Sequence, residues 1–285
     1  MKVALLTCDD LSGYITDDEI LVEAFRKKFP RTVLEEVSLS APVDWSQYTC
    51  AVVRTTWDYT KRHKDFLEVM KKIDQSGCLL LNPFSILKWN TEKTYLKDLE
   101  REDIPVIKSL FLKEESGESL KEKIISWPQD KVVLKPVVGA SADQIRVLTK
   151  KDFFTELSSL TLKKDWFVQP FMNEVNQGEL SFIFFGNQLS HTVIKKPKPG
   201  DFRVHEEHGG STEIYNPNEE EMKFAKEVVD SLSEELLYAR VDALQTEEGL
   251  HLIELELVEP SLYLRKKPDA ANMFLEALEV RLPRI

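Results

Sequence analysis

The sequence predicts an α/β (α+β) protein with a parallel N-terminal layer followed by units that contain antiparallel hairpins. Short apolar runs alternate with helical stretches over the first third of the chain, as in a parallel sheet covered by helices. Further along, pairs of apolar runs are joined by short turns, at residues 180–194 and 238–257, which is typical of antiparallel strands.

Composition limits the classes of protein and partner. The chain has 285 residues, 42% hydrophobic and 31% charged, so it is globular and long enough for two or three subdomains. A formal net charge of −11 opposes non-specific binding to nucleic acid, so small-molecule partners are expected. No apolar run approaches the ~18 residues of a membrane span. An odd number of cysteines in apolar surroundings favours reduced thiols and a cytoplasmic protein (Cys8, Cys50 and Cys78).

The first unit carries the substrate-facing candidates. Apolar periodicity predicts strands at 2–7, 32–37, 48–53 and 78–81 and helices at 16–29 and 61–75. Ligands of such layers bind beyond the carboxyl ends of the strands, where the third strand runs into Arg54, Thr55, Trp57 and Asp58. Arg54 suits a substrate carboxylate through bidentate hydrogen bonds. The alternative is an Arg–Asp surface pair with Trp57 covering a core edge. No Gly-x-Gly-x-x-Gly follows the first strand, which disfavours a dinucleotide fold.

Two lysines follow at positions that suit an anion. Residues 90–99 are predicted as a helix capped by Asn90, and Lys93 in its first turn opposes the helix dipole unless an anion compensates it. Lys135 ends an apolar strand and precedes small residues, 137–142, that suit a mobile flap; the alternative is an edge lysine that extends to solvent. The unit around it is predicted to have strands near 107–112, 132–136, 145–148 and 166–172 and helices at 118–126 and 151–160.

The stretch after this unit offers further binding groups. The strand ending in Gln169, Pro170, Phe171 and Met172 enters a hinge whose backbone groups can bind an adenine edge. A hairpin at 180–194 leads into an aperiodic polar loop, 195–210. Within this loop Lys195, Lys196, Gly209 and Gly210 fit an anion-lined substrate pocket. His205 and His208 alone are poor zinc spacing. Helices are predicted at 218–236, capped by Asn216 or Asn218, and at 270–282.

Three acidic residues stand out in an apolar hairpin with its turn at 246–249. Glu254 and Glu256 lie two apart on the second strand and therefore on one face, and antiparallel pairing brings Asp242 near them. Three such carboxylates repel one another unless a cation lies between them, and their oxygens suit Mg²⁺. The alternative is an amphipathic strand with solvated glutamates.

The ordered set of motifs resembles the ATP-grasp superfamily, in its glutathione-synthetase-like branch. The resemblance implies that Lys93 and Lys135 contact nucleotide phosphate, that residues 169–172 bind adenine, that Glu179 binds ribose and that Arg203 stabilises the transferring phosphoryl group. Asp242, Glu254 and Glu256 match the Mg-ATP signature, for one or two ions, although Glu256 stands where the family usually has Asn. Arg-Thr-Thr-Trp-Asp-Tyr, Lys-Pro-x-x-Gly-Asp-Phe-Arg-Val and Glu-Leu-Glu-Leu-x-Glu-Pro-Ser-Leu look closest to the family of cyclo-ligases that close O-ureido-D-serine to D-cycloserine.

This resemblance implies a Rossmann-like N-terminal domain (1–105), a central lid subdomain (106–172) and a C-terminal antiparallel-sheet subdomain (173–285). The expected function is an ATP-dependent carboxylate–amine ligase that forms an acyl phosphate and ADP, with an amide or a closed ring as product. The expected substrates are amino acids or small peptide-like molecules, and a homodimer is left open. The alternatives are a non-catalytic ATP-binding regulatory module and a structural interaction protein.

Overall fold

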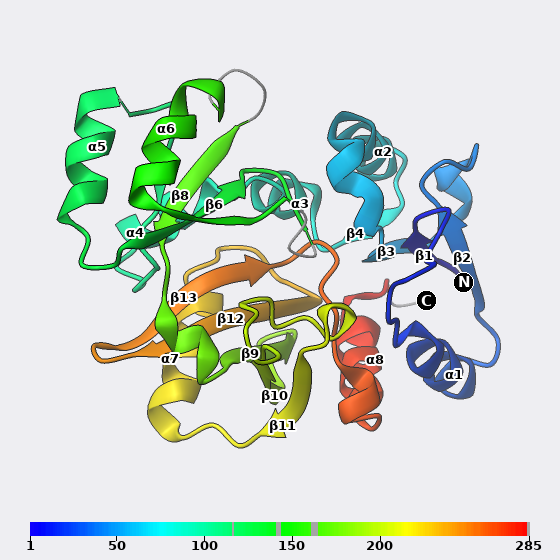
Figure 1. The fold of residues 1–285 in the computed structure, drawn as a ribbon. Helices are drawn as coiled ribbons and strands as arrows, with labels where there is room; N and C mark the ends of the chain where they lie inside the picture. Colours follow the sequence, from blue (N-terminus) through cyan, green and yellow to red (C-terminus); the bar gives the residue numbers. More distant parts are fainter. Residues whose placement is uncertain (116, 141–143, 161–164, 284–285) are drawn as a thin grey trace.

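The computed structural model describes residues 1–115, 117–140, 144–160 and 165–283, and their strands form three sheets (Figure 1). The N-terminal sheet has the order β2-β1-β3-β4 and is parallel throughout, as predicted. Its strands are β1 (Lys2–Thr7), β2 (Val33–Ser38), β3 (Cys50–Thr55) and β4 (Leu79–Leu81). No described helix is long and apolar enough to cross a membrane.

Alternation along β1 explains how the N-terminal layer packs. Val3 and Leu5 pack with helix α1 (Asp18–Lys28), whereas Ala4 and Leu6 pack with helix α2 (His63–Gln75). Successive residues of a strand point to opposite faces, so a continuous apolar strand can serve a helix on each side. Figure 1 shows the two helices on opposite sides of this sheet.

The predicted helix at 90–99 is wrong in its start. Asn90 ends helix α3 (Phe84–Asn90), and Lys93 lies between this helix and α4 (Tyr95–Arg101). The Asn90 side chain donates to the Leu255 carbonyl and accepts from the Leu257 amide, at 2.8 Å each. The side-chain amide of Asn90 therefore binds the backbone at the end of a distant strand and does not cap the helix that the local sequence predicted.

The central sheet is antiparallel, with the order β5-β8-β6-β7. Its strands are β5 (Leu110–Phe111), β6 (Lys131–Pro136), β7 (Arg146–Thr149) and β8 (Trp166–Pro170). Helices α5 (Gly117–Ser126) and α6 (Lys150–Leu160) cover it around a small core of its own. Of the predicted flap at 137–142, residues 141 and 142 lie outside the described part of the chain.

The large sheet is antiparallel, with the order β11-β10-β9-β12-β13. Its strands are β9 (Glu179–Phe185), β10 (Gln188–Lys196), β11 (Ser211–Tyr215), β12 (Tyr238–Thr246) and β13 (Gly249–Glu256). Strand β11 was not predicted, and helix α7 (Glu219–Asp230) ends earlier than predicted. The predicted cap is correct, because Asn218 forms a capping box with Glu221.

Two helices cover opposite faces of the large sheet. Phe182 and Phe184 of β9 share a core with α7, while Ile183 and Phe185 share another with α8 (Ala270–Arg281). The second core also contains Leu21 and Phe25 of α1, so α8 joins the N-terminal layer to the large sheet. Short 3-10 turns lie at Trp45–Gln47, Trp57–Lys61, Asn173–Asn176, Glu206–His208 and Leu264–Lys266.

Candidate active site

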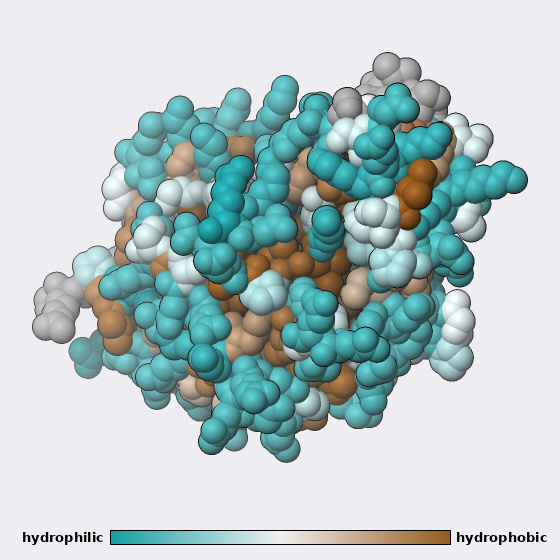
Figure 2. Space-filling model, turned by 90° about the vertical axis from the view of Figure 1, so that its left-hand side faces the viewer, coloured by the Kyte–Doolittle hydropathy of each residue, from teal (hydrophilic) through white to brown (hydrophobic). Residues whose placement is uncertain are grey.

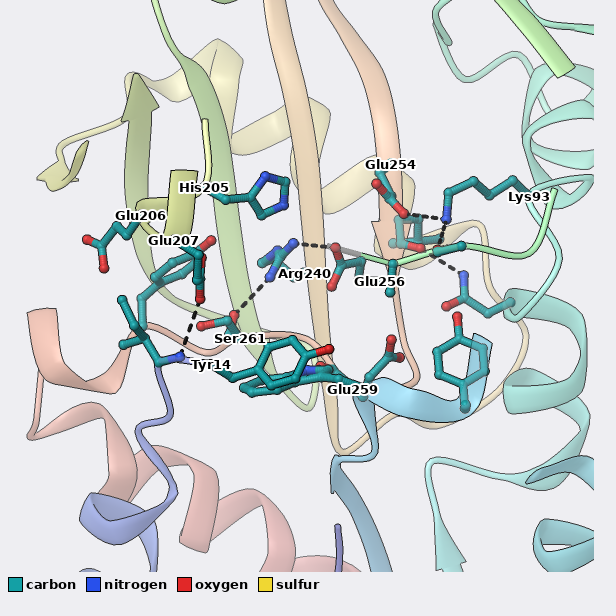
Figure 3. Close-up of a pocket in the computed structure, with 18 of the residues that line it drawn as sticks. Tyr14, Lys93, His205, Glu206, Glu207, Arg240, Glu254, Glu256, Glu259 and Ser261 are labelled. Atoms are coloured by element: carbon teal, nitrogen blue, oxygen red, sulfur yellow. Dashed lines mark hydrogen bonds and ion pairs between the residues drawn. The ribbon is translucent and has the colours of Figure 1, made fainter. Parts of the chain in front are cut away.

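The β12–β13 hairpin places the acidic residues between two pockets. Its register sets Asp242 opposite Glu254 and Arg240 opposite Glu256. One pocket lies toward the central sheet and contains Lys135 and residues 169–172; we call it the nucleotide pocket. The other lies toward the N-terminal layer and contains Trp57 and Tyr59; we call it the second pocket (Figure 3). Arg240, His205, Glu254 and Glu256 line both, so a group held in one can reach a group held in the other.

Asp242 is buried among hydrogen-bond donors. It accepts from the Ser181 hydroxyl at 2.5 Å, from Lys195 Nζ at 3.2 Å and from Arg240 at 2.9 to 3.2 Å. Burial opposes ionisation, but Arg240 and Lys195 outweigh it and hold the pKa of Asp242 well below its ordinary value. The carboxylate is therefore ionised and fixed in place at neutral pH.

The two glutamates of β13 differ in their partners and in their pKa values. Glu254 lies 2.7 Å from Lys93 Nζ, which lowers its pKa against the effect of burial. Glu256 pairs with Arg240, but burial and the neighbouring Glu254 and Asp242 raise its pKa to about 7. Lys93 also donates to the Gly139 carbonyl at 2.8 Å, which ties this pair to the segment after β6.

Lys135 is the exception among the cations. It is only 9% exposed and lines the nucleotide pocket, yet within the described part of the chain no hydrogen bond or ion pair reaches its ammonium group. Burial lowers its pKa, partly offset by the charges of Glu254 and Glu179. A buried, unpaired ammonium is costly, which is a feature typical of ligand sites.

The predicted adenine segment and ribose acid lie in the same pocket. Pro170, Phe171 and Met172 line it, and the Gln169 side chain donates to Ser109 Oγ at 2.9 Å. Apolar side chains form the remaining walls at this end, namely Ile107, Val133, Val175, Leu244 and Ile253. Glu179 also lines the pocket and lies 2.5 Å from Lys195.

Arg54 is not placed to bind a substrate carboxylate, which corrects the sequence prediction. It is 2% exposed, and its guanidinium donates to Asp18 Oδ1 at 3.0 and 3.3 Å and to the Pro260 carbonyl at 3.2 Å. The alternative of an Arg–Asp pair is correct in kind, but the pair is buried and the partner is Asp18. Arg54 therefore joins β3 to helix α1 and to the segment after β13.

The other substrate candidates are spread over different places. Trp57 lines the second pocket and donates from Nε1 to the Glu259 carbonyl at 2.9 Å. Thr55 is buried and donates to Thr7 Oγ1, and Asp58 lies 3.8 Å from Arg62 in a separate surface pocket. These two are therefore not brought to the hairpin.

The candidates in the loop at 195–210 mainly make contacts within the protein. A Cβ atom on Gly210 would overlap the Val204 carbonyl oxygen, so close backbone packing requires this glycine. Lys195 is buried in pairs with Glu179 and Asp242, which corrects its assignment to an anion-lined substrate pocket. Arg203 does line the nucleotide pocket, where it lies 2.8 Å from Asp201.

Sequence reasoning missed three groups of this site. Arg240 lies two residues before Asp242, and this spacing on one strand was a usable signal for a shared face. Glu259 and His205 gave a weaker signal, because their pockets form only when loops from distant parts of the chain meet. Burial, Lys195 and Arg240 lower the pKa of His205 to about 4, so this ring is neutral near pH 7.

The donor set at the hairpin fits Mg²⁺ in part. Glu254 and Glu256 expose 29% and 25% of their side chains and supply the hard oxygen ligands that Mg²⁺ prefers. Asp242 fits only if Lys195 and Arg240 release it. Over residues 1–115, 117–140, 144–160 and 165–283, no three His, Cys, Asp or Glu side chains form a ready metal site.

Comparison with protein families assigns both halves of the chain. Residues 90–280 match the model of the RimK-like ATP-grasp domain, and residues 3–82 match that of the N-terminal domain of D-cycloserine synthetase DcsG. The chain is 26% identical over 256 residues to the cycloserine biosynthesis protein DcsG of Streptomyces lavendulae, covering 84% of this chain and 85% of that protein. It is 24% identical over 217 residues to a probable alpha-L-glutamate ligase of Coxiella burnetii, covering 74% and 70%.

Solved structures show the same fold. The crystal structure of D-cycloserine synthetase DcsG matches with a TM-score of 0.84 at 23% identity, over 99% of this chain and 100% of that one. A D-alanine–D-alanine ligase from Bacillus anthracis matches with a TM-score of 0.70 at 14% identity, over 99% and 98%. These findings confirm the predicted ATP-grasp fold and the narrower likeness to D-cycloserine synthetase. The chain belongs to the RimK-like ATP-grasp family and is an ATP-dependent ligase of that family.

Proposed function

We propose that this ligase converts the carboxylate of a small amino-acid-like substrate to an acyl phosphate and joins it to an amine, with release of ADP and phosphate. The observation that carries the proposal is Lys135, a buried ammonium that lines the nucleotide pocket and has no anionic partner among the described residues. A phosphate oxygen would supply the missing charge-assisted hydrogen bond.

The lining of the nucleotide pocket supports a role for each group. Lys135 and Arg203 line this pocket, whereas Lys93 lines the second pocket and pairs with Glu254 between the two. Lys93 and Lys135 hold phosphate oxygens, and Arg203 offsets charge on the transferring phosphoryl group. The backbone of residues 170–172, next to Gln169, binds the adenine edge between apolar side chains, and Glu179 accepts from the ribose hydroxyls. Lys195, paired with Glu179 and Asp242, orients both carboxylates.

The hairpin carboxylates are the proposed holders of Mg²⁺. Glu254 and Glu256 are accessible from both pockets, and Asp242 lies behind them. One or two magnesium ions would neutralise phosphate charge there. Lys93 and Arg240 are then freed from the glutamates and can turn to phosphate or substrate oxygens.

The second pocket is the proposed place of the substrates. It borders the hairpin carboxylates, and its lining combines aromatic rings with charged side chains, which suits a small polar molecule. Whether the product is an amide or a ring depends on whether carboxylate and amine belong to one molecule. A cytoplasmic location and a homodimer stay predictions from the sequence.

Hydroxylamine trapping tests the acyl phosphate. The protein is incubated with ATP, Mg²⁺, hydroxylamine and single carboxylates, beginning with D-alanine and L-glutamate, and both hydroxamate and phosphate are measured. We expect a hydroxamate whose amount equals the phosphate released, and its loss in Lys135→Ala but not in Lys131→Ala, an exposed lysine of the same strand. Phosphate release that a carboxylate stimulates without any hydroxamate would contradict the acyl phosphate.

A further inference from the structure

The second pocket is built from several distant parts of the chain, and the following inference about it rests on the proposed function. The N-terminal layer contributes Tyr14, Trp57 and Tyr59, and the hairpin contributes Arg240 and Glu256. The segment after β13 contributes Glu259, Ser261, Tyr263 and Arg265, and the rest of the lining comes from residues 90–93, 139–140 and 205–207. Figure 3 labels Tyr14, Arg240, Glu256, Glu259 and Ser261 among the residues that line this pocket.

The cations of this pocket already have anionic partners. Lys93 pairs with Glu254, and Arg240 pairs with Asp242 and Glu256. Arg265 lies 2.9 Å from Asp17 and also pairs with Glu206. Without a bound metal ion the charges of these cations are therefore already compensated, unlike the charge of Lys135 in the nucleotide pocket.

Glu259, in contrast to these cations, has no oppositely charged partner among the described residues. Only 8% of the residue is exposed, yet in the described ranges of the chain its carboxylate has no ion pair, and the one hydrogen bond to it comes from its own backbone amide. Glu259 lines the pocket, and Figure 3 shows its side chain below Glu256 in the view. A buried carboxylate without a cationic partner is costly, so a ligand that supplies a positive charge would remove this cost.

The backbone around Glu259 is fixed from the N-terminal layer. Its carbonyl accepts from Trp57 Nε1 at 2.9 Å, and the next carbonyl, that of Pro260, accepts from Arg54 at 3.2 Å. These two bonds hold the segment that carries the carboxylate. The position of Glu259 is thus part of the fold and does not depend on a free loop.

Aromatic rings complete the surroundings. The Tyr14 and Trp57 rings lie 4.9 Å apart, and Tyr59 and Tyr263 line the same cavity. Aromatic faces attract ammonium groups, and their attraction grows when the site excludes water. A carboxylate next to aromatic rings in a small cavity is therefore suited to a primary ammonium group.

We propose that Glu259 binds the ammonium group of the amine-bearing substrate, and that the second pocket therefore takes free amino acids in preference to their N-acylated forms. One carboxylate oxygen accepts from the ammonium while the rings of Tyr14, Trp57 and Tyr59 surround it. The amine end of the substrate is then held next to the hairpin that separates this pocket from the nucleotide.

Equilibrium binding tests this subsite without turnover. Thermal unfolding of the MgADP-bound protein is followed with glycine, D-alanine and L-glutamate and with the N-acetyl derivative of each. We expect the free form of at least one to raise the midpoint, and its N-acetyl derivative to bind at least tenfold more weakly. Measurements on the wild-type protein are sufficient to overturn the proposal: equal effects of the free and acetylated forms would do so, and so would the absence of any effect of the free forms.

Two variants assign the effect to one carboxylate. Glu259→Gln keeps the shape and removes the charge, and Glu248→Gln makes the same change at the exposed tip of the β12–β13 hairpin. We expect amino-acid affinity to fall at least tenfold in the first and less than twofold in the second, with MgADP affinity unchanged in both. Wild-type affinity in Glu259→Gln would remove Glu259 from the subsite. Failure of MgADP to stabilise the wild type would instead contradict the proposed function, so the two failures are distinguishable.

Discussion

Asp242 and Glu254 face each other across the β12–β13 hairpin, yet they bond to different cations. Asp242 accepts from Arg240 and Lys195, whereas Glu254 pairs with Lys93. The repulsion that the sequence predicted among the hairpin carboxylates is therefore largely relieved without a metal ion. What remains is concentrated at Glu256, whose pKa is raised to about 7 chiefly by burial.

This arrangement predicts opposite effects on stability from two neighbouring neutral substitutions. Asp242→Asn removes the partner of two buried cations and should lower the free energy of unfolding by about 3–5 kcal/mol. Glu256→Gln removes an unfavourable buried charge and should leave that free energy unchanged or higher. Urea unfolding at pH 7.5 without nucleotide measures both. Equal losses in the two variants would contradict the pairing seen here.

The same Glu256→Gln variant tests the proposed magnesium site. If Glu256 binds the ion, phosphate release measured against Mg²⁺ concentration should require more Mg²⁺ in the variant than in the wild type. A glutamine oxygen is a weaker ligand but still a ligand, so partial activity at saturating Mg²⁺ is expected. Superimposable curves would remove Glu256 from the metal site.

Lys135→Ala should separate nucleotide binding from folding. The ammonium group is buried without a described partner, so its removal should not lower the stability of the nucleotide-free protein. The stabilisation by MgADP should fall by about 1.4 kcal/mol or more, which corresponds to a tenfold weaker Kd. Thermal unfolding with and without MgADP measures this, with Lys131→Ala as the control. A nucleotide effect of wild-type size would refute the phosphate contact.

Arg54→Ala should act mainly on stability. Asp18 and the Pro260 carbonyl would both lose a buried donor, and breaking a buried ion pair costs about 3–5 kcal/mol. Arg62→Ala is the matched control in the same layer, because its pairs with Asp9 and Asp58 are 3.9 and 3.8 Å long and partly exposed. That change should cost at most about 1 kcal/mol. Similar free energies of unfolding in the two variants would show that the Arg54 pair is not structural.

The local patterns were sufficient for most of the fold. Continuous apolar runs predicted the parallel strands, because a strand covered on both faces needs no polar alternation, as β1 shows with Val3 and Ala4. The turn before Gly249 and the cap at Asn218 were readable because their chemistry is local. The start of the helix at Asn90 failed because its amide binds backbone groups 165 and 167 residues away.

The candidate site was predictable where residues lie on one strand and not where loops meet. Period-2 spacing placed Glu254 and Glu256 together, and the apolar run ending at Lys135 indicated a buried lysine. Burial of Arg54 was not readable, because its partners Asp18 and Pro260 come from distant segments. The isolation of Glu259 was unreadable for the same reason, since a missing partner is a property of the assembled pocket.

Glu259 should make the stability of the nucleotide-free protein depend on pH in a window set by its pKa. Burial, assisted by the charges of Glu256 and Glu254 and opposed by Lys93, raises this pKa from 4.5 to about 8. Between these values the native state keeps a proton that the unfolded state loses, so stability falls as the pH rises and levels off above about 8. Glu259→Gln carries no such proton. Its melting temperature should match that of the wild type near pH 4.5 and exceed it by roughly 2–4 °C at pH 8.5. A gain of about 1 kcal/mol in the free energy of unfolding produces a change of this size in a chain of this length. Other titrating groups, including His205, are common to both proteins and cancel in the difference. Melting curves at half-unit intervals of pH measure this difference in melting temperature, with Glu248→Gln as control. A difference between the wild type and Glu259→Gln that stays constant at every pH would show that Glu259 is already ionised in the folded chain.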